Sequence, residues 1–130
     1  MMTKTPTLSD IKVKRKSGLV SLQFDSGESF DLSFEFLRVH SPSAEVKGHG
    51  PGQEVLQTGK KHVQIKGLSP VGHYALQIEF DDGHDSGLYS FAYLYQLCAQ
   101  QETLWSRYLR ALEEAGASRD PDVQVIRLGN

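Results

Sequence analysis

The segment LQFDSG at Leu22–Gly27 decides much of the fold, because IEFDDG at Ile78–Gly83 nearly repeats it within the 130-residue chain. In both copies an apolar alternation leads into an acidic turn that ends in glycine, which is typical of a β-hairpin. A short aromatic segment follows each hairpin, at Phe34–Leu37 and at Phe91–Leu94. Two interpretations stay open: an internally repeated unit, or the common pattern of any hairpin that leads into a helix.

Alternating residues on either side of these turns predict further strands. The segments with this pattern are 11–15, 19–24, 28–32, 62–68, 74–80 and 84–89. Together they predict one antiparallel or mixed sheet of five to six strands. Ser33 is a suitable N-cap for a short helix over Phe34–Val39, whose apolar side chains would pack against that sheet.

The C-terminal third predicts a long helical segment. Ser90–Ala115 contains neither glycine nor proline, and its apolar residues recur at three- and four-residue steps. Gly116 is a suitable residue to end this helix. A bend is expected at the polar run 99–102, because a straight helix of this length would extend beyond a small sheet. The expected fold class is therefore α+β, with a bent helical segment covering the sheet.

Size and charge restrict the class of protein. With 38% hydrophobic residues, the chain can bury one modest core. We expect one domain over residues 11–116, a flexible lead-in at 1–10 and a flexible tail at 117–130. A net charge of −2 gives no basis for binding nucleic acid or an anionic membrane. Because no apolar stretch approaches the roughly 20 residues that span a bilayer, and no secretory signal starts the chain, we expect a cytoplasmic protein.

A glycine- and proline-rich loop separates the two copies of the repeat. Its centre, GHGPGQ at Gly48–Gln53, leaves no room for a regular element. Long loops within small domains are commonly functional or mobile, so we expect this loop and the turn at His84 to contact a protein partner. The expected contact residues are Arg38, His40, Gly48, His49, Gly50, Pro51, Gly52, Gln53 and His84.

Histidines and aspartates near these loops raise the question of a metal. His40, His49 and His84 fall at or near loops, and Asp82 and Asp85 flank the last of them. Imidazole and carboxylate groups would suit iron if the loops converge. Turns of this composition occur far more often without a metal, so neither metal nor cofactor is expected. Iron bound by these five residues is the alternative.

Catalytic patterns are missing from the sequence. No serine lies in a G-x-S-x-G elbow, and no pair of carboxylates stands out for acid–base chemistry. Cys98 lies on the apolar face of the predicted helix with no basic neighbour to lower its pKa. The chain is therefore not expected to be an enzyme.

Three segments, taken in order, resemble the gamma-butyrobetaine hydroxylase-like N-terminal domain family. They are FLRVHSPSAEV at 36–46, GHGPGQ at 48–53 and FDDGHDSGLYS at 80–90, and the resemblance extends over about Thr7–Gly116. Members of this family stand alone in bacteria, precede an iron- and 2-oxoglutarate-dependent hydroxylase domain, or follow a P-loop iron–sulfur scaffold protein. In the fused members the chemistry belongs to the other domain. The resemblance implies a non-catalytic adaptor or, alternatively, an iron-binding accessory in iron–sulfur cluster or cofactor assembly.

The resemblance also implies what has become of a zinc site. Hydroxylase relatives bind zinc through a Leu-Arg-x-x-Cys-x-Cys-x-x-Cys run and a distant histidine. Here the thiolate positions are Ser41, Ser43 and Val46, and only His84 remains. Hydroxyl and hydrocarbon side chains are not zinc ligands at neutral pH, so this site should be absent. The His-x-Asp facial triad of the hydroxylase domain is also missing, and a remnant that binds carnitine-like ligands would need an aromatic cage.

Overall fold

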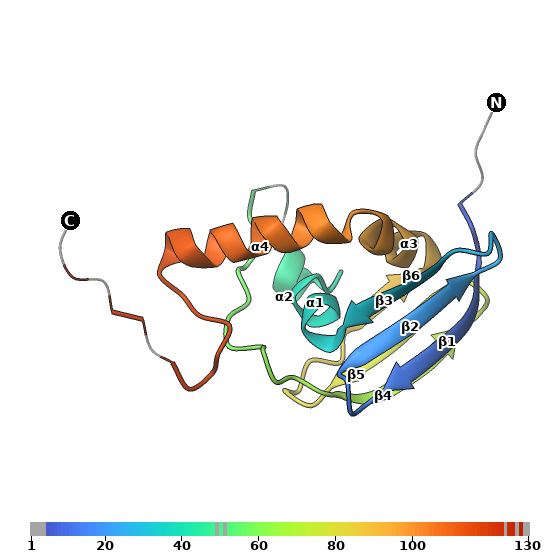
Figure 1. Ribbon diagram of the computed structural model, residues 1–130, viewed down its shortest axis with the longest axis horizontal. Coiled ribbons are helices and arrows are strands. Elements are labelled where there is room, and N and C mark those ends of the chain that lie inside the picture. The colour runs from blue at the N-terminus through green and yellow to red at the C-terminus, as the bar shows by residue number, and fades with distance from the viewer. Residues whose placement is uncertain (1–4, 49, 51, 124, 127, 129–130) are drawn as a thin grey trace.

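The computed structural model describes residues 5–48, 50, 52–123, 125–126 and 128. Within these residues the chain forms six strands and four helices, arranged as two successive units (Figure 1). The first unit contains β1 (Leu8–Lys14), β2 (Leu19–Phe24), β3 (Ser29–Ser33), α1 (Phe34–Val39) and α2 (Ala44–Lys47). The second contains β4 (Ile65–Val71), β5 (Ala75–Phe80), β6 (Gly87–Ser90), α3 (Phe91–Ala99) and α4 (Gln101–Ala115).

The α+β class is confirmed, but the expectation of a single sheet is wrong. Within the described residues the strands form two three-stranded antiparallel sheets, ordered β1-β2-β3 and β4-β5-β6. Figure 1 shows β4 and β5 lying behind β1 and β2. Leu22 and Phe24 of one sheet belong to the same buried core as Ile78 and Phe80 of the other. Alternation predicts each strand, but it does not tell which strands share hydrogen bonds.

The two units repeat the same turn contacts, which favours the interpretation of an internal repeat. In each turn the N–H of an aspartate donates to the carbonyl of the residue just before the first strand of its unit. The carboxylate of the same aspartate accepts the N–H of that residue at 3.0 Å. The paired residues are Asp25 with Thr7 and Asp81 with Gln64. A hairpin does not require this reciprocal contact, so its recurrence indicates a shared local design.

The helices α1, α3 and α4 begin and end close to where the sequence predicts. The hydroxyl of Ser33 accepts the N–H of Phe36 at 2.9 Å at the start of α1, and Ser90 accepts the N–H of Tyr93 at 3.0 Å at the start of α3. The expected bend is confirmed, because α3 ends at Ala99 and α4 begins at Gln101. α4 passes over α1 and α2 (Figure 1), where Val39, Tyr108 and Leu112 form a second apolar cluster.

The connection between the units is partly ordered by contacts with the C-terminal segment. α2 lies within the predicted loop and was not predicted. The N–H groups of Gly59 and Lys61 donate to the carbonyls of Ser118 and Arg119, at 3.0 and 2.9 Å. These contacts hold the beginning of segment 117–130, for which the sequence predicted a flexible tail. Among the described residues, no helix has both the length and the apolar character needed to cross a bilayer.

The two matched caps should contribute equally to stability. We expect Ser33→Ala and Ser90→Ala each to lower the free energy of unfolding by about 1 kcal/mol, because each leaves a helix N–H without its acceptor. Urea unfolding measures the change. Ser106→Ala, at an exposed position of α4, is the control and should change stability by less than about 0.5 kcal/mol. A negligible cost at either cap would contradict the shared design.

Candidate functional site

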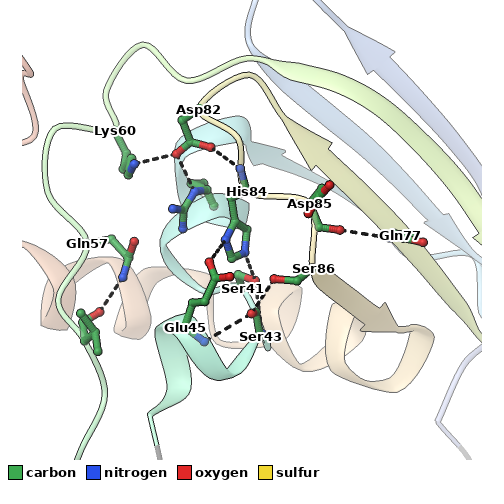
Figure 2. Close-up of polar contacts among 12 residues, drawn as sticks. Ser41, Ser43, Glu45, Gln57, Lys60, Gln77, Asp82, His84, Asp85 and Ser86 are labelled. Carbon is green, nitrogen blue, oxygen red and sulfur yellow. Dashed lines mark hydrogen bonds and ion pairs between the residues drawn. The ribbon is translucent and has the colours of Figure 1, made fainter.

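A polar cluster, buried except for the exposed side chain of Glu45, joins the two units. Ser41 and Ser43 lie in the connection from α1 to α2, Glu45 lies on α2, and His84 lies in the turn from β5 to β6. Ser41 is 0% exposed and His84 4% exposed. Figure 2 shows the imidazole of His84 directed toward Glu45 and Ser41. Buried polar groups need hydrogen-bond partners, and these residues supply them to one another.

Both nitrogens of the His84 ring are engaged. Nε2 lies 2.7 Å from Ser41 Oγ, and Nδ1 lies 3.0 Å from Glu45 Oε2. A carboxylate only accepts, so Nδ1 carries the proton in the neutral ring and Nε2 accepts the Ser41 hydroxyl proton. Ser41 Oγ in turn accepts the Ser43 N–H at 3.3 Å, and the hydroxyls of Ser43 and Ser86 lie 2.8 Å apart. The network is therefore closed on the side of the serines.

This connectivity is that of a serine–histidine–acid triad, yet the serine lacks room to react. A nucleophilic hydroxyl must stand beside space for the substrate carbonyl. Ser41 has no exposed surface, although it borders an apolar pocket. A Cβ built on Gly87 would lie only 2.7 Å from Ser41 Oγ, so the β6 backbone lies close against the hydroxyl. In this geometry the network satisfies buried polar groups.

A charged cluster adjoins the network through Asp82. Its Oδ2 accepts Arg38 Nε at 2.8 Å and Lys60 Nζ at 2.6 Å, and its Oδ1 accepts the His84 N–H at 3.2 Å. Burial alone would raise the pKa of Asp82. The hydrogen bonds from Lys60, Arg38 and the His84 amide, with the charge of Arg38, instead lower this pKa to about 2. Arg38 Nη1 is buried with no hydrogen-bond partner among the described residues.

The apolar pocket encloses about 270 Å³ beside this cluster, between α1, α2, the loop before Lys60 and α4. Its apolar walls come from Val39, Val46, Val55, Leu56, Tyr108 and Ala111. His40 also borders it, with Nδ1 2.9 Å from the Phe36 carbonyl oxygen. Burial lowers the pKa of His40, with the charge of Lys47 adding to this and the Phe36 hydrogen bond opposing it. The pocket is therefore lined mainly by apolar groups, and the charged side chains of Lys47 and Glu54 also border it.

The predicted partner-contact residues differ in their accessibility. Arg38 and His84 are buried, at 6% and 4% exposure, so little of either residue can touch a partner directly. His40, Gly48 and Gly50 are half-buried, and Gly52 and Gln53 are exposed. The remaining two predictions, His49 and Pro51, lie outside the described residues.

The four candidate iron ligands that the structure describes are not gathered into one group. His40 binds the Phe36 carbonyl, whereas Asp82 pairs with Arg38 and Lys60. Across the described part of the chain, no three or more His, Cys, Asp or Glu residues are arranged to hold a metal ion. The fifth candidate, His49, lies outside the described residues. Ser41, Ser43 and His84, three of the four positions that the resemblance aligns with zinc ligands, do meet, because they share one hydrogen-bonded network.

Sequence reasoning missed three members of the site. Glu45 and Lys60 bind residues 39 and 22 positions away in the chain, and Ser86 binds Ser43 at a separation of 43. No local spacing connects such partners. The only usable signal was the resemblance, which placed Glu45 and Ser86 in two of its three segments.

A family model and several solved structures are similar to this chain. The family model described as gamma-butyrobetaine hydroxylase-like, N-terminal, matches residues 11–95. One NMR solution structure is 49% identical, covers 96% of this chain and 98% of its own, and has a TM-score of 0.81. A second is 48% identical, covers 100% of both chains and has a TM-score of 0.78.

A crystal structure also matches. It is a protein with unknown function from Acidithiobacillus ferrooxidans that belongs to the DUF971 family. It is 34% identical, covers 72% of this chain and 93% of its own, and has a TM-score of 0.61. The search of curated proteins found no match.

Asp82 should make stability depend on acid pH. A pKa lowered in the folded state gives stability that is present above the unfolded pKa, near 4, and is lost as pH falls toward 2. Because solvent partly screens Asp82, we expect the loss across that window to be about 1 kcal/mol, less than the full shift would give. In Asp82→Asn this dependence should flatten, and stability at pH 7 should fall by about 1–2 kcal/mol, because the buried Arg38 loses its counter-charge.

Urea unfolding from pH 7 to pH 2 checks this expectation. The matched control is Asp85→Asn, since the Asp85 carboxylate bonds to no described residue and only the Asp85 carbonyl accepts from Gln77. An Asp82→Asn protein with unaltered stability and an unaltered acid profile would show that the carboxylate does not anchor the site.

Proposed function

The chain belongs to the gamma-butyrobetaine hydroxylase-like, N-terminal family, and on that premise we propose that it is a non-catalytic domain that binds a protein partner. One observation carries the proposal. Ser41 and His84 bond to each other inside the fold and His84 also bonds to the exposed Glu45, while mainly apolar side chains line the pocket beside them. Such a surface suits an apolar side chain of a partner better than it suits chemistry on a substrate.

The loop beside the pocket is held in position to make this contact. Val55 is 52% exposed, and its N–H donates to the Val46 carbonyl at 2.8 Å. This bond fixes the loop against α2, so an exposed apolar side chain stands at the pocket edge with little conformational freedom. A preorganised surface of this kind loses less entropy when a partner binds.

Arg38 and His84 act as positioning residues in this proposal. Arg38 joins α1 to Asp82, and His84 joins the β5–β6 turn to Glu45 on α2. These bonds hold α1 and α2 against the β5–β6 turn, and so they fix the position of Gly48, where the loop begins. The direct contacts are assigned to Gly48–Leu56, within which the described residues Gly52 and Gln53 are exposed.

The residues present do not fit the zinc of the hydroxylase relatives. Ser41 Oγ and His84 Nε2 are hydrogen-bonded at 2.7 Å, whereas two ligands of one tetrahedral zinc lie about 3.5 Å apart. Val46 offers no donor atom. Iron binding by His84, the alternative function, would have to displace Ser41 or Glu45 from the ring, since both ring nitrogens are engaged. We therefore favour the adaptor over the iron-binding accessory.

Two glycines give a matched test of partner binding. A Cβ at Gly48, where φ is +73°, would lie 2.0 Å from the Gln53 carbonyl oxygen, whereas a Cβ at Gly67, in β4 and outside the loop, would meet nothing closer than 3.5 Å. We expect Gly48→Ala to displace the loop and lose the partner, and Gly67→Ala to keep it. Affinity capture from lysate of the source organism with quantitative mass spectrometry compares both with the native protein.

Amide NMR spectra control for folding in this experiment. Shifts in Gly48→Ala confined to the loop show that the sheets are intact. If such a protein captures the same partners at the same abundance as the native chain, the loop is not the binding surface.

Restoring the thiolates should restore a metal site. We expect the Ser41→Cys, Ser43→Cys, Val46→Cys triple variant to bind one zinc per chain, and to lose it when His84→Asn is added. The native protein, purified anaerobically, should hold neither zinc nor iron in stoichiometric amount. Elemental analysis measures both metals. Stoichiometric iron in the native protein that disappears with His84→Asn would instead support the iron-binding accessory.

A further inference from the structure

A basic cleft separate from the apolar pocket has no role in the proposed function. It encloses about 440 Å³ between the β1–β2 turn, the start of α1, the segment before β4, and Trp105 of α4. Its lining shares no residue with that of the apolar pocket. The charged lining residues are Arg15, Lys16, Glu35, Lys61 and Arg119. Four cations and one carboxylate leave the cleft positive, although the chain as a whole carries −2.

The single carboxylate in the cleft is already neutralised. Arg119 donates to both oxygens of Glu35, from Nε at 2.8 Å and from Nη2 at 2.6 Å. The side chain of Glu35 is 6% exposed, and the Arg119 guanidinium lies 5.0 Å from the centre of the Trp105 ring. This pair builds one wall of the cleft and leaves the other cations without a counter-charge.

Three cations remain to receive a ligand. Arg15 donates from Nη1 to the Ile65 carbonyl at 2.5 Å, which fixes its side chain. Its other N–H groups remain available to a ligand. Lys16 and Lys61 form neither an ion pair nor a hydrogen bond through their ammonium groups with any described residue. Because these cations come from two segments far apart in the sequence, they present several separate positive positions.

The cleft does not offer a phosphate cradle. Backbone N–H groups near the start of α1 are already bonded: Phe34 donates to the Gly18 carbonyl at 2.9 Å and Phe36 to the Ser33 hydroxyl at 2.9 Å. Anion sites for a single phosphate use converging backbone amides. Side-chain cations spread over separate segments suit carboxylates spaced along an extended chain. The half-buried ring of Trp105 adds apolar surface for a neighbouring side chain.

We propose that this cleft binds an acidic peptide segment of a protein partner, with carboxylates at Arg15, Lys16 and Lys61 and an apolar side chain against Trp105. The proposal goes beyond the adaptor function, because it uses a second surface that the Gly48 loop does not form. A long polyanion such as nucleic acid is disfavoured, since the negative charge of the rest of the chain would repel it outside the cleft.

Charge reversal in the cleft tests the proposal. The probe is a fluorescein-labelled synthetic peptide in which glutamates flank one phenylalanine, titrated with the full chain at about 50 mM salt. Lys16→Glu with Lys61→Glu should weaken binding at least about tenfold. The control, Lys12→Glu with Arg107→Glu, changes the net charge equally at exposed positions outside the cleft, and should change affinity less than about twofold.

Trp105→Ala separates the apolar contact from the electrostatic one. It should weaken peptide binding while leaving the dependence of affinity on salt unchanged, because no charge is removed. Amide NMR shifts on adding peptide should cluster around the cleft, and Gly48→Ala should bind the peptide normally. Failure of the adaptor function at the loop is thereby distinguished from failure here.

Three outcomes would overturn the proposal. An equal loss in the control pair would show that the attraction is diffuse. Tighter binding of a single-stranded DNA oligonucleotide of the same charge would assign the cleft to a nucleic acid. Absence of saturable peptide binding would show that the cleft does not recognise acidic chains.

Discussion

The carboxylate of Asp82 is the constraint on which the site depends. It accepts hydrogen bonds from α1 through Arg38, from the inter-unit loop through Lys60, and from the backbone of His84 in its own turn. A buried guanidinium without a counter-charge is costly, so Arg38 in α1 requires this acid. The His84 amide bond then fixes the turn that places the imidazole between Ser41 and Glu45. The polar interior and the loop geometry both depend on one acidic side chain.

The internal repeat shows how one backbone design supports two different surroundings. The carbonyl at Glu28 accepts the N–H of Phe24, as the carbonyl at His84 accepts that of Phe80. Glu28 is nevertheless exposed and accepts from Tyr95, whereas His84 is buried. The difference comes from the helices after each hairpin. α1 is short and leads into α2, which brings Glu45 over the second turn, while α3 leads into the long α4. Among the described residues, the polar contacts of the first turn are exposed, whereas those of the second turn include the buried His84 and Ser41.

The sequence predicts those features that depend on interactions between residues close together in the chain. Alternation predicts strands, Ser33 predicts a helix start, and Gly116 predicts a helix end, because each depends on neighbouring residues. It fails for the division into two sheets and for Glu45, since strand order and the partner of His84 depend on contacts far along the chain. Net charge does not predict the basic cleft, for a related reason. A value of −2 averages over the whole surface and hides the positive cleft that folding assembles around Lys16 and Lys61.

The burial of His84 has a physical explanation that does not require a metal. The Ser41 hydroxyl is wholly buried and donates to Nε2, so replacing the imidazole by an apolar group would leave that donor unpaired. The Glu45 carboxylate would lose its only bonded partner among the described residues and its hold on the turn. An unpaired buried polar group costs about 1–3 kcal/mol, which is a large part of the stability of a small domain. Ser41 therefore makes the histidine a structural requirement, and the network supports the surfaces beside it.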